Sequence, residues 1–282
     1  MSFSSELKKE LCRIDNAPCC MLAEAYGLLL FGRSFGTRGI SLMTESADVA
    51  KRYRDNVRTL FGIAPEITRS DAGNYTVSIS GASARTVIEK LGYTGKEVTA
   101  RLNMANIENP CCTGAFLRGV FLAVGSVTNP EREYHFELLI SRAKLTDDLI
   151  RFMSDIDDLE ISPKRIRRSS GYAIYFKNAD SIEDLIGLIG GNASYFKVMN
   201  VRATKAVVNK INRRMNFENA NLDRTINASV AQRKWIASIE RYSSLGGLAD
   251  DLRTLALLRK ANPEMSLDEL GSHFDPPLSR SA

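Results

Sequence analysis

The stretch CCMLAEAYGLLLFGRS at residues 19–34 recurs as CCTGAFLRGVFLAVGS at residues 111–126. Repeats are the first feature to look for, because they define the architecture. The apolar positions match between the copies, and so do five identical residues: Cys19, Cys20, Ala23, Gly27 and Ser34 pair with Cys111, Cys112, Ala115, Gly119 and Ser126. Residues four apart share one helical face, so the small residues predict two copies of one helix packed closely together.

A second set of identities follows after a short insertion in the loop GSVTNPEREY. It pairs Pro65, Arg69, Gly73, Ile88 and Gly92 with Pro163, Arg167, Gly171, Ile186 and Gly190. Each copy has the same order: an apolar helix, an extended stretch, a helix, two strands joined at a glycine, and a closing helix. We expect Ser181 to be the N-cap of the closing helix in the second copy. Two αββα-type repeats, residues 19–95 and 111–193, predict a pseudo-two-fold α+β domain over residues 1–195.

The first helix of each repeat resembles a known motif. AYGLLLFGR (25–33) and LRGVFLAVG (117–125) resemble degenerate copies of the LAGLIDADG motif of homing endonucleases. Gly27 and Gly119 fall on the first glycine of the motif. The resemblance implies that Gly32 and Val124 occupy the position of the metal-binding acidic residue in each copy.

This substitution bears on catalysis. Metal-assisted phosphodiester hydrolysis needs carboxylates to hold the ion that activates water, and neither Gly32 nor Val124 offers one. Glu24 lies eight residues before Gly32, about 12 Å along the helix, so it cannot take over. We therefore expect no catalytic residue, no metal and no cofactor. The alternative enzyme hypothesis is a cryptic nuclease with a displaced metal site.

The asparagine-rich segment INRRMNFENANLDRTINAS (211–229) is the most specific signal in the chain, and it resembles the WhiA family. That resemblance covers nearly the whole chain. It implies a LAGLIDADG-like domain followed by an all-α helix-turn-helix domain. It also implies a non-enzymatic, DNA-binding regulator of transcription, linked to cell division, chromosome segregation and sporulation in Gram-positive bacteria.

The C-terminal helices can be predicted independently. Residues 229–242 form one helix, with Trp235, Ile236 and Ile239 turned inward, and residues 248–261 form the next. Ser266 to Glu269 is a capping box for a short third helix, which ends by Phe274 ahead of two prolines. This is a helix-turn-helix layout. Only the start of the expected recognition helix is present, namely Ser279, Arg280, Ser281 and Ala282. Either the chain is truncated there, or this protein has lost the helix.

The positive charge is concentrated near the C-terminus. Residues 195–282 hold 14 Lys/Arg against 9 Asp/Glu, which accounts for the whole net charge of +5. Clustered positive charge attracts a phosphate backbone, although a solvated helix face explains it equally well. We predict a basic linker helix over residues 196–225 and a helix-turn-helix domain over 226–282. The candidate contacts to double-stranded DNA are Lys205, Lys210, Arg213, Arg214, Arg224, Arg233, Lys234, Ser279, Arg280 and Ser281.

A basic run, Lys164 to Arg168, begins a strand of the second repeat. In LAGLIDADG proteins the sheet forms a saddle over DNA, so the resemblance offers Arg165 and Arg167 as saddle contacts. Alternation places these two on one face of the strand and Lys164 and Arg168 on the other. At least two of the four side chains are therefore expected to be simply exposed to solvent. Simple solvation of the whole run is an equally good interpretation.

Four cysteines, Cys19, Cys20, Cys111 and Cys112, could meet between the two repeated helices as a zinc site. Adjacent helical residues point about 100° apart, unlike the spaced ligand pairs of structural zinc sites. We therefore favour small, buried, reduced thiols over a metal site. Five cysteines in a chain of 282 residues do not indicate a disulfide framework.

The composition, 44% hydrophobic and 25% charged, is that of a globular protein with a proper core. No segment approaches the roughly 18 apolar residues of a membrane span, and the N-terminus lacks the apolar region of a signal peptide. We expect a cytoplasmic, nucleoid-associated protein with no membrane partner. A third hypothesis is a scaffold that binds a protein partner through the LAGLIDADG-like domain.

Overall fold

The computed structural model describes residues 2–156 and 161–279. By its internal contacts the chain divides into two compact units, Met1–Ala203 and Thr204–Ala282. The first unit contains both sheets, whereas the described part of the second is helical. No described helix combines the length and the apolar character that crossing a membrane requires.

The first unit starts with α1 (Phe3–Leu11), which buries Phe3, Leu7 and Leu11 as the helical period predicts. The first repeat follows in the predicted order. Its elements are α2 (Pro18–Leu30), β1 (Gly39–Thr44), α3 (Ala47–Phe61), β2 (Glu66–Arg69), β3 (Tyr75–Ser80) and α4 (Gly81–Lys90).

The second repeat follows a connecting 3₁₀ turn η1 (Met104–Asn106) and has the same order with one additional short strand, β4. Its elements are α5 (Pro110–Val124), β4 (Gly125–Val127), β5 (Phe136–Ile140), α6 (Ala143–Ser154), β6 (Lys164–Arg168), β7 (Gly171–Phe176) and α7 (Ala179–Leu188). The antiparallel sheets have strand orders β1-β3-β2 and β4-β5-β7-β6. The isolated bridge between Ser34 and Ser41 is the first repeat's counterpart of the β4–β5 pairing.

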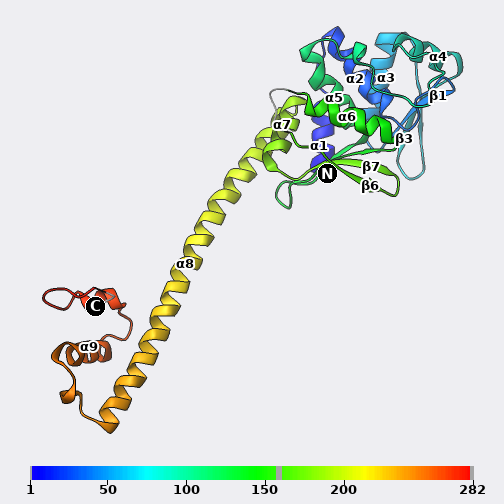
Figure 1. Ribbon diagram of the computed structural model, residues 1–282. Coiled ribbons are helices and arrows are strands. Elements are labelled where there is room, and N and C mark those ends of the chain that lie inside the picture. Colours follow the sequence, from blue (N-terminus) through cyan, green and yellow to red (C-terminus); the bar gives the residue numbers. More distant parts are fainter. Residues whose placement is uncertain (1, 157–160, 280–282) are drawn as a thin grey trace. The chain divides into compact units, whose positions relative to one another are not determined.

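The predicted close contact between the two repeated helices is confirmed. Figure 1 shows α2 and α5 side by side, and this pair has the most extensive contact in the fold. An added Cβ at Gly27 would lie 2.5 Å from the Phe116 carbonyl oxygen, and one at Gly119 would lie 2.1 Å from that of Glu24. Only glycine permits this approach, because the obstructing atoms are backbone.

One cap in the second repeat differs from the prediction. Ser181 is not the N-cap of α7. Asn178 is, and its side-chain oxygen accepts a hydrogen bond from the Asp180 amide at 3.1 Å. Ser181 lies inside the first turn and is buried. Both residue types cap helices well, so sequence alone does not separate the two.

The predicted linker helix and the first helix of the C-terminal domain form one continuous helix, α8 (Asn192–Tyr242). Its first turns pack in the first unit, where the Ala193 amide donates to Glu10 at 2.7 Å, and its remainder belongs to the second. The second unit adds η2 (Leu245–Gly247), α9 (Asp250–Ala261) and α10 (Leu267–Gly271).

Candidate nucleic-acid interface

The two degenerate motif positions lie at the C-terminal ends of α2 and α5. A Cβ on the buried Gly32 would lie 2.6 Å from the Ser41 carbonyl oxygen, so no side chain fits there without a shift of backbone. Arg142 donates to the carbonyl oxygens of Leu30 and Gly32, which places a guanidinium beside this position. Val124 lines a hollow of about 520 Å³ whose lining also includes Lys8 and Glu45.

Glu24, which sequence reasoning excluded as a metal ligand, has a structural role. Its fully buried carboxylate accepts hydrogen bonds from Arg52 at 2.6 Å and from Arg118 at 2.7 Å. Asn16 and Asn56 donate to the same carboxylate. Burial alone would raise the pKa of Glu24, but the two arginines outweigh burial and lower it. The network joins α2, α3, α5 and the α1–α2 loop.

The strand β6 presents different side chains on its two faces. Arg165 and Arg167 lie opposite Ile174 and Tyr172 of β7, on the face where Ile174 is buried against the helices. Arg165 pairs with Asp147 of α6, and its guanidinium lies 4.2 Å from the Tyr172 ring centroid. The two saddle candidates therefore share the helix-covered side of the sheet.

The opposite, open face of this sheet carries the other half of the basic run. Lys164 lies opposite Tyr175 there, and Arg168 donates to Glu137 at 2.9 Å. Ile166 lies between them with 42% of its surface exposed. This face thus combines one ion-paired arginine with one lysine and an apolar residue, which is a weak charge pattern for a phosphate backbone.

The basic residues of α8 are better placed. At about 100° per residue, Lys210, Arg213, Arg214 and Arg224 fall within an arc of about 100° on one side of the helix, and all four are exposed. We call these four residues the α8 basic face. A separate side of α8 carries exposed apolar residues: Val208, Ile211, Met215, Leu222 and Ile226.

The remaining candidates on α8 lie off this face. Lys205 is half-buried, whereas Arg233 and Lys234 are exposed. The latter two line a hollow of about 360 Å³ that also holds Lys260, whose ammonium group pairs with Glu240 at 2.6 Å. The helix-turn-helix region therefore has its own smaller basic patch.

The capping box that begins α10 is confirmed, since Ser266 and Glu269 exchange side-chain-to-amide hydrogen bonds. Ile236 is buried as predicted, but Trp235 is 66% exposed, so its inward assignment was wrong. Ser279 is exposed and not helical. Arg280, Ser281 and Ala282 lie outside the described residues.

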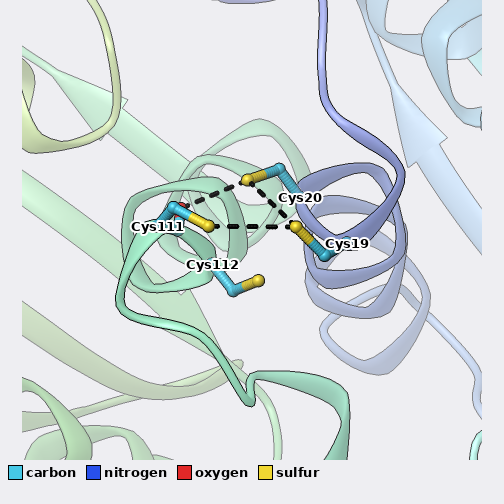
Figure 2. A group of neighbouring side chains, drawn as sticks. All are labelled: Cys19, Cys20, Cys111 and Cys112. Carbon is cyan, nitrogen blue, oxygen red and sulfur yellow. Dashed lines mark hydrogen bonds between the residues drawn. The ribbon is translucent and has the colours of Figure 1, made fainter.

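The four cysteines at the helix starts do converge (Figure 2). Their Sγ atoms all lie within 4.8 Å of one another, with 3.8 Å between Cys19 and Cys111 and 4.0 Å between Cys19 and Cys20. The argument that adjacent cysteines point too far apart was therefore wrong. Among the described residues, these four cysteines form a group whose ligand atoms lie close enough together to hold a metal ion.

The comparisons with known proteins cover the whole chain. The chain is 34% identical over 297 residues to the "Probable cell division protein WhiA" of Ruminiclostridium cellulolyticum, spanning all of this chain and 93% of that protein. It is 31% identical over 299 residues to that of Alkaliphilus metalliredigens, again with 93% of that protein covered. The chain belongs to the WhiA family.

The family models match both parts of the chain. Residues 113–208 match the WhiA LAGLIDADG-like domain, and residues 211–282 match the WhiA C-terminal HTH domain. The crystal structure of full-length WhiA from Thermatoga maritima superposes with a TM-score of 0.63 at 25% identity, covering 100% of this chain and 93% of that one. The predicted fold, a LAGLIDADG-like α+β domain followed by a helix-turn-helix domain, is thereby confirmed, and the α8 basic face lies mostly within the HTH match.

Proposed function

We propose that this protein binds double-stranded DNA through its second unit and regulates transcription without cleaving the DNA. The observation that carries the proposal is the α8 basic face, of which Arg213, Arg214 and Arg224 lie within the match to an HTH domain. Exposed lysine and arginine side chains on one helix side suit phosphate contacts, which position a protein on the duplex independently of sequence. Base readout would require the recognition helix of a helix-turn-helix.

Three features support the absence of cleavage. Gly32 and Val124 provide no carboxylate at the motif positions. Introducing one at Gly32 is sterically blocked by the Ser41 backbone. The Arg142 guanidinium beside the Gly32 carbonyl adds a positive charge that opposes a divalent cation.

We assign the open sheet face a minor part in DNA binding. Arg168 is engaged with Glu137, and Arg165, one of the original saddle candidates, pairs with Asp147 on the other side of the sheet. The exposed Ile166 suits a protein partner better than phosphate. The relatives are called cell division proteins, which suggests that the regulated process is division. On the strength of the family resemblance we also propose a role in sporulation or chromosome segregation and a place on the nucleoid in the cytoplasm.

The test compares two triple variants with the same charge change. Lys210→Ala with Arg213→Ala and Arg224→Ala removes three residues of the α8 basic face. Lys51→Ala with Arg58→Ala and Arg85→Ala removes three exposed basic residues of the first unit. Fluorescence anisotropy measures the affinity for several unrelated duplexes between 50 and 200 mM salt.

Each phosphate contact contributes about 0.9 to the slope of log affinity against log salt. Removing three contacts should lower that slope by about 2.7, so between these salt concentrations the wild type should lose on the order of 40-fold more affinity than the α8 variant. The control variant should keep the wild-type slope. Equal slopes for the wild type and the α8 variant would reject the α8 basic face as the interface.

A further inference from the structure

The N-terminal ends of α2 and α5 bring together four thiols that DNA binding does not use. Cys19 and Cys20 follow Pro18 at the start of α2, and Cys111 and Cys112 follow Pro110 at the start of α5. The internal duplication thus supplies two equivalent ligand pairs, one from each repeat. Two pairs related by a two-fold axis are a natural source of four tetrahedral ligands.

The separations between the thiols match a single metal ion. In a tetrahedral zinc site with Zn–S bonds of about 2.3 Å, neighbouring sulfur atoms lie about 3.8 Å apart. Here the Cys19 and Cys111 sulfurs are 3.8 Å apart, those of Cys19 and Cys20 are 4.0 Å apart, and no pair exceeds 4.8 Å. An iron–sulfur cluster places several iron and sulfide atoms between its thiolates, so it needs wider spacing.

The surroundings favour an anionic centre. Neither Ala17 nor Asn109, the N-caps of the two helices, makes a side-chain capping bond, and neither first turn contains an acidic residue. The uncapped amides and the positive ends of two helix dipoles therefore face the thiol group. Four thiolates around Zn²⁺ carry a net charge of −2, which these groups would stabilise.

The site is also reachable and complete. Cys111 is exposed, so an ion can enter, while Cys112 is buried with 2% of its surface accessible. Four cysteine ligands leave no open coordination position, which is the pattern of a structural rather than a catalytic zinc.

We propose that Cys19, Cys20, Cys111 and Cys112 bind one zinc ion that joins the two repeats at the starts of α2 and α5. Binding converts four thiols and Zn²⁺ into a tetrathiolate complex and releases four protons, with no change of oxidation state. The zinc holds the helix ends together, while Gly27 and Gly119 set the contact farther along the same pair. The proposal is independent of how the protein binds DNA.

The first test uses the wild-type chain of 282 residues, reduced and purified. After incubation with zinc and dialysis, elemental analysis should find one zinc per chain. Cobalt in place of zinc should give the intense visible absorption and sulfur-to-metal charge-transfer bands of tetrahedral thiolate coordination. Dialysed protein without zinc and without these cobalt bands would overturn the proposal, as would a Cys19–Cys111 disulfide in protein isolated under non-oxidising conditions.

The second test compares variants. Cys19→Ser with Cys111→Ser removes one ligand from each repeat, and Cys12→Ser is the matched control because Cys12 lies outside the group. The double variant should lose the stoichiometric zinc, and the control should retain it. A chelator should lower the melting temperature of the wild type and of the control but not that of the double variant. Undiminished zinc in the double variant would place the metal elsewhere and refute the assignment.

Discussion

Replacing Gly119 with alanine tests the contact between the repeats on which the first unit is built. The new methyl carbon would lie 2.1 Å from the Glu24 carbonyl oxygen and 3.1 Å from the Leu28 amide nitrogen. Both obstructing atoms belong to the α2 backbone, so no side-chain rotation relieves the overlap. Ordinary contact requires at least 3.4 Å, so α2 and α5 must separate by about 1 Å.

The magnitude follows from this displacement. A gap of 0.5–1 Å removes about a quarter to a half of the dispersion energy of each contact it opens. The α2–α5 interface includes Tyr26 and Phe116, whose ring centroids are 5.7 Å apart, and both residues are fully buried. Overpacking in cores commonly costs about 1–3 kcal/mol. Because the backbone cannot yield locally, we expect a loss at the upper end, about 3 kcal/mol.

Urea unfolding followed by far-ultraviolet circular dichroism measures this loss. The single tryptophan, Trp235, lies in the second unit, so its fluorescence should report an unchanged transition there. Gly36→Ala is the matched control, since nothing lies within 4 Å of its added Cβ. It should change stability by less than about 0.5 kcal/mol. If Gly119→Ala were equally neutral, the two helices would not be in the described contact.

A second prediction concerns the buried carboxylate of Glu24. Glu24→Gln leaves Arg52 and Arg118 without their counter-ion and should cost about 3 kcal/mol in urea unfolding, whereas Glu131→Gln at an exposed position should cost almost nothing. Since the folded-state pKa of Glu24 is lowered, its stabilising effect is fully present above the ordinary value of 4.5 and is lost as the pH falls through the folded-state pKa. The stability difference between wild type and variant should therefore shrink in acid, and a difference that stayed constant down to pH 3 would contradict the proposed network.

The architecture of the first unit could be predicted because two independent patterns agree. The duplication defines the repeats, and the apolar periodicity defines helices and strands within each. The length of α8 was not predicted, although the signal was present: neither glycine nor proline occurs between Asn192 and Tyr242. The asparagine-rich composition suggested a linker, but helices end at breakers and caps rather than at changes of polarity.

The sites were harder to predict than the fold. Alternation along β6 separates Arg165 and Arg167 from Lys164 and Arg168, but it does not reveal which pair faces the helices. The usual indicator misleads here, because the apolar Ile166 points to the open face. The meeting of the cysteines depends on how α2 and α5 are rotated about their own axes. The small residues predict that these helices touch, but the rotation that brings the four thiols together is visible only in the structure.

The most direct test of binding without cleavage examines both in one experiment. Supercoiled plasmid is incubated with the full chain and magnesium, and one half of each sample is run on a native gel while the other is deproteinised first. We predict retarded plasmid in the native lanes, unaffected by chelator, and fully supercoiled plasmid in the deproteinised lanes. Magnesium-dependent nicking that chelator abolishes would contradict the account, and so would plasmid that migrates unretarded at every protein concentration.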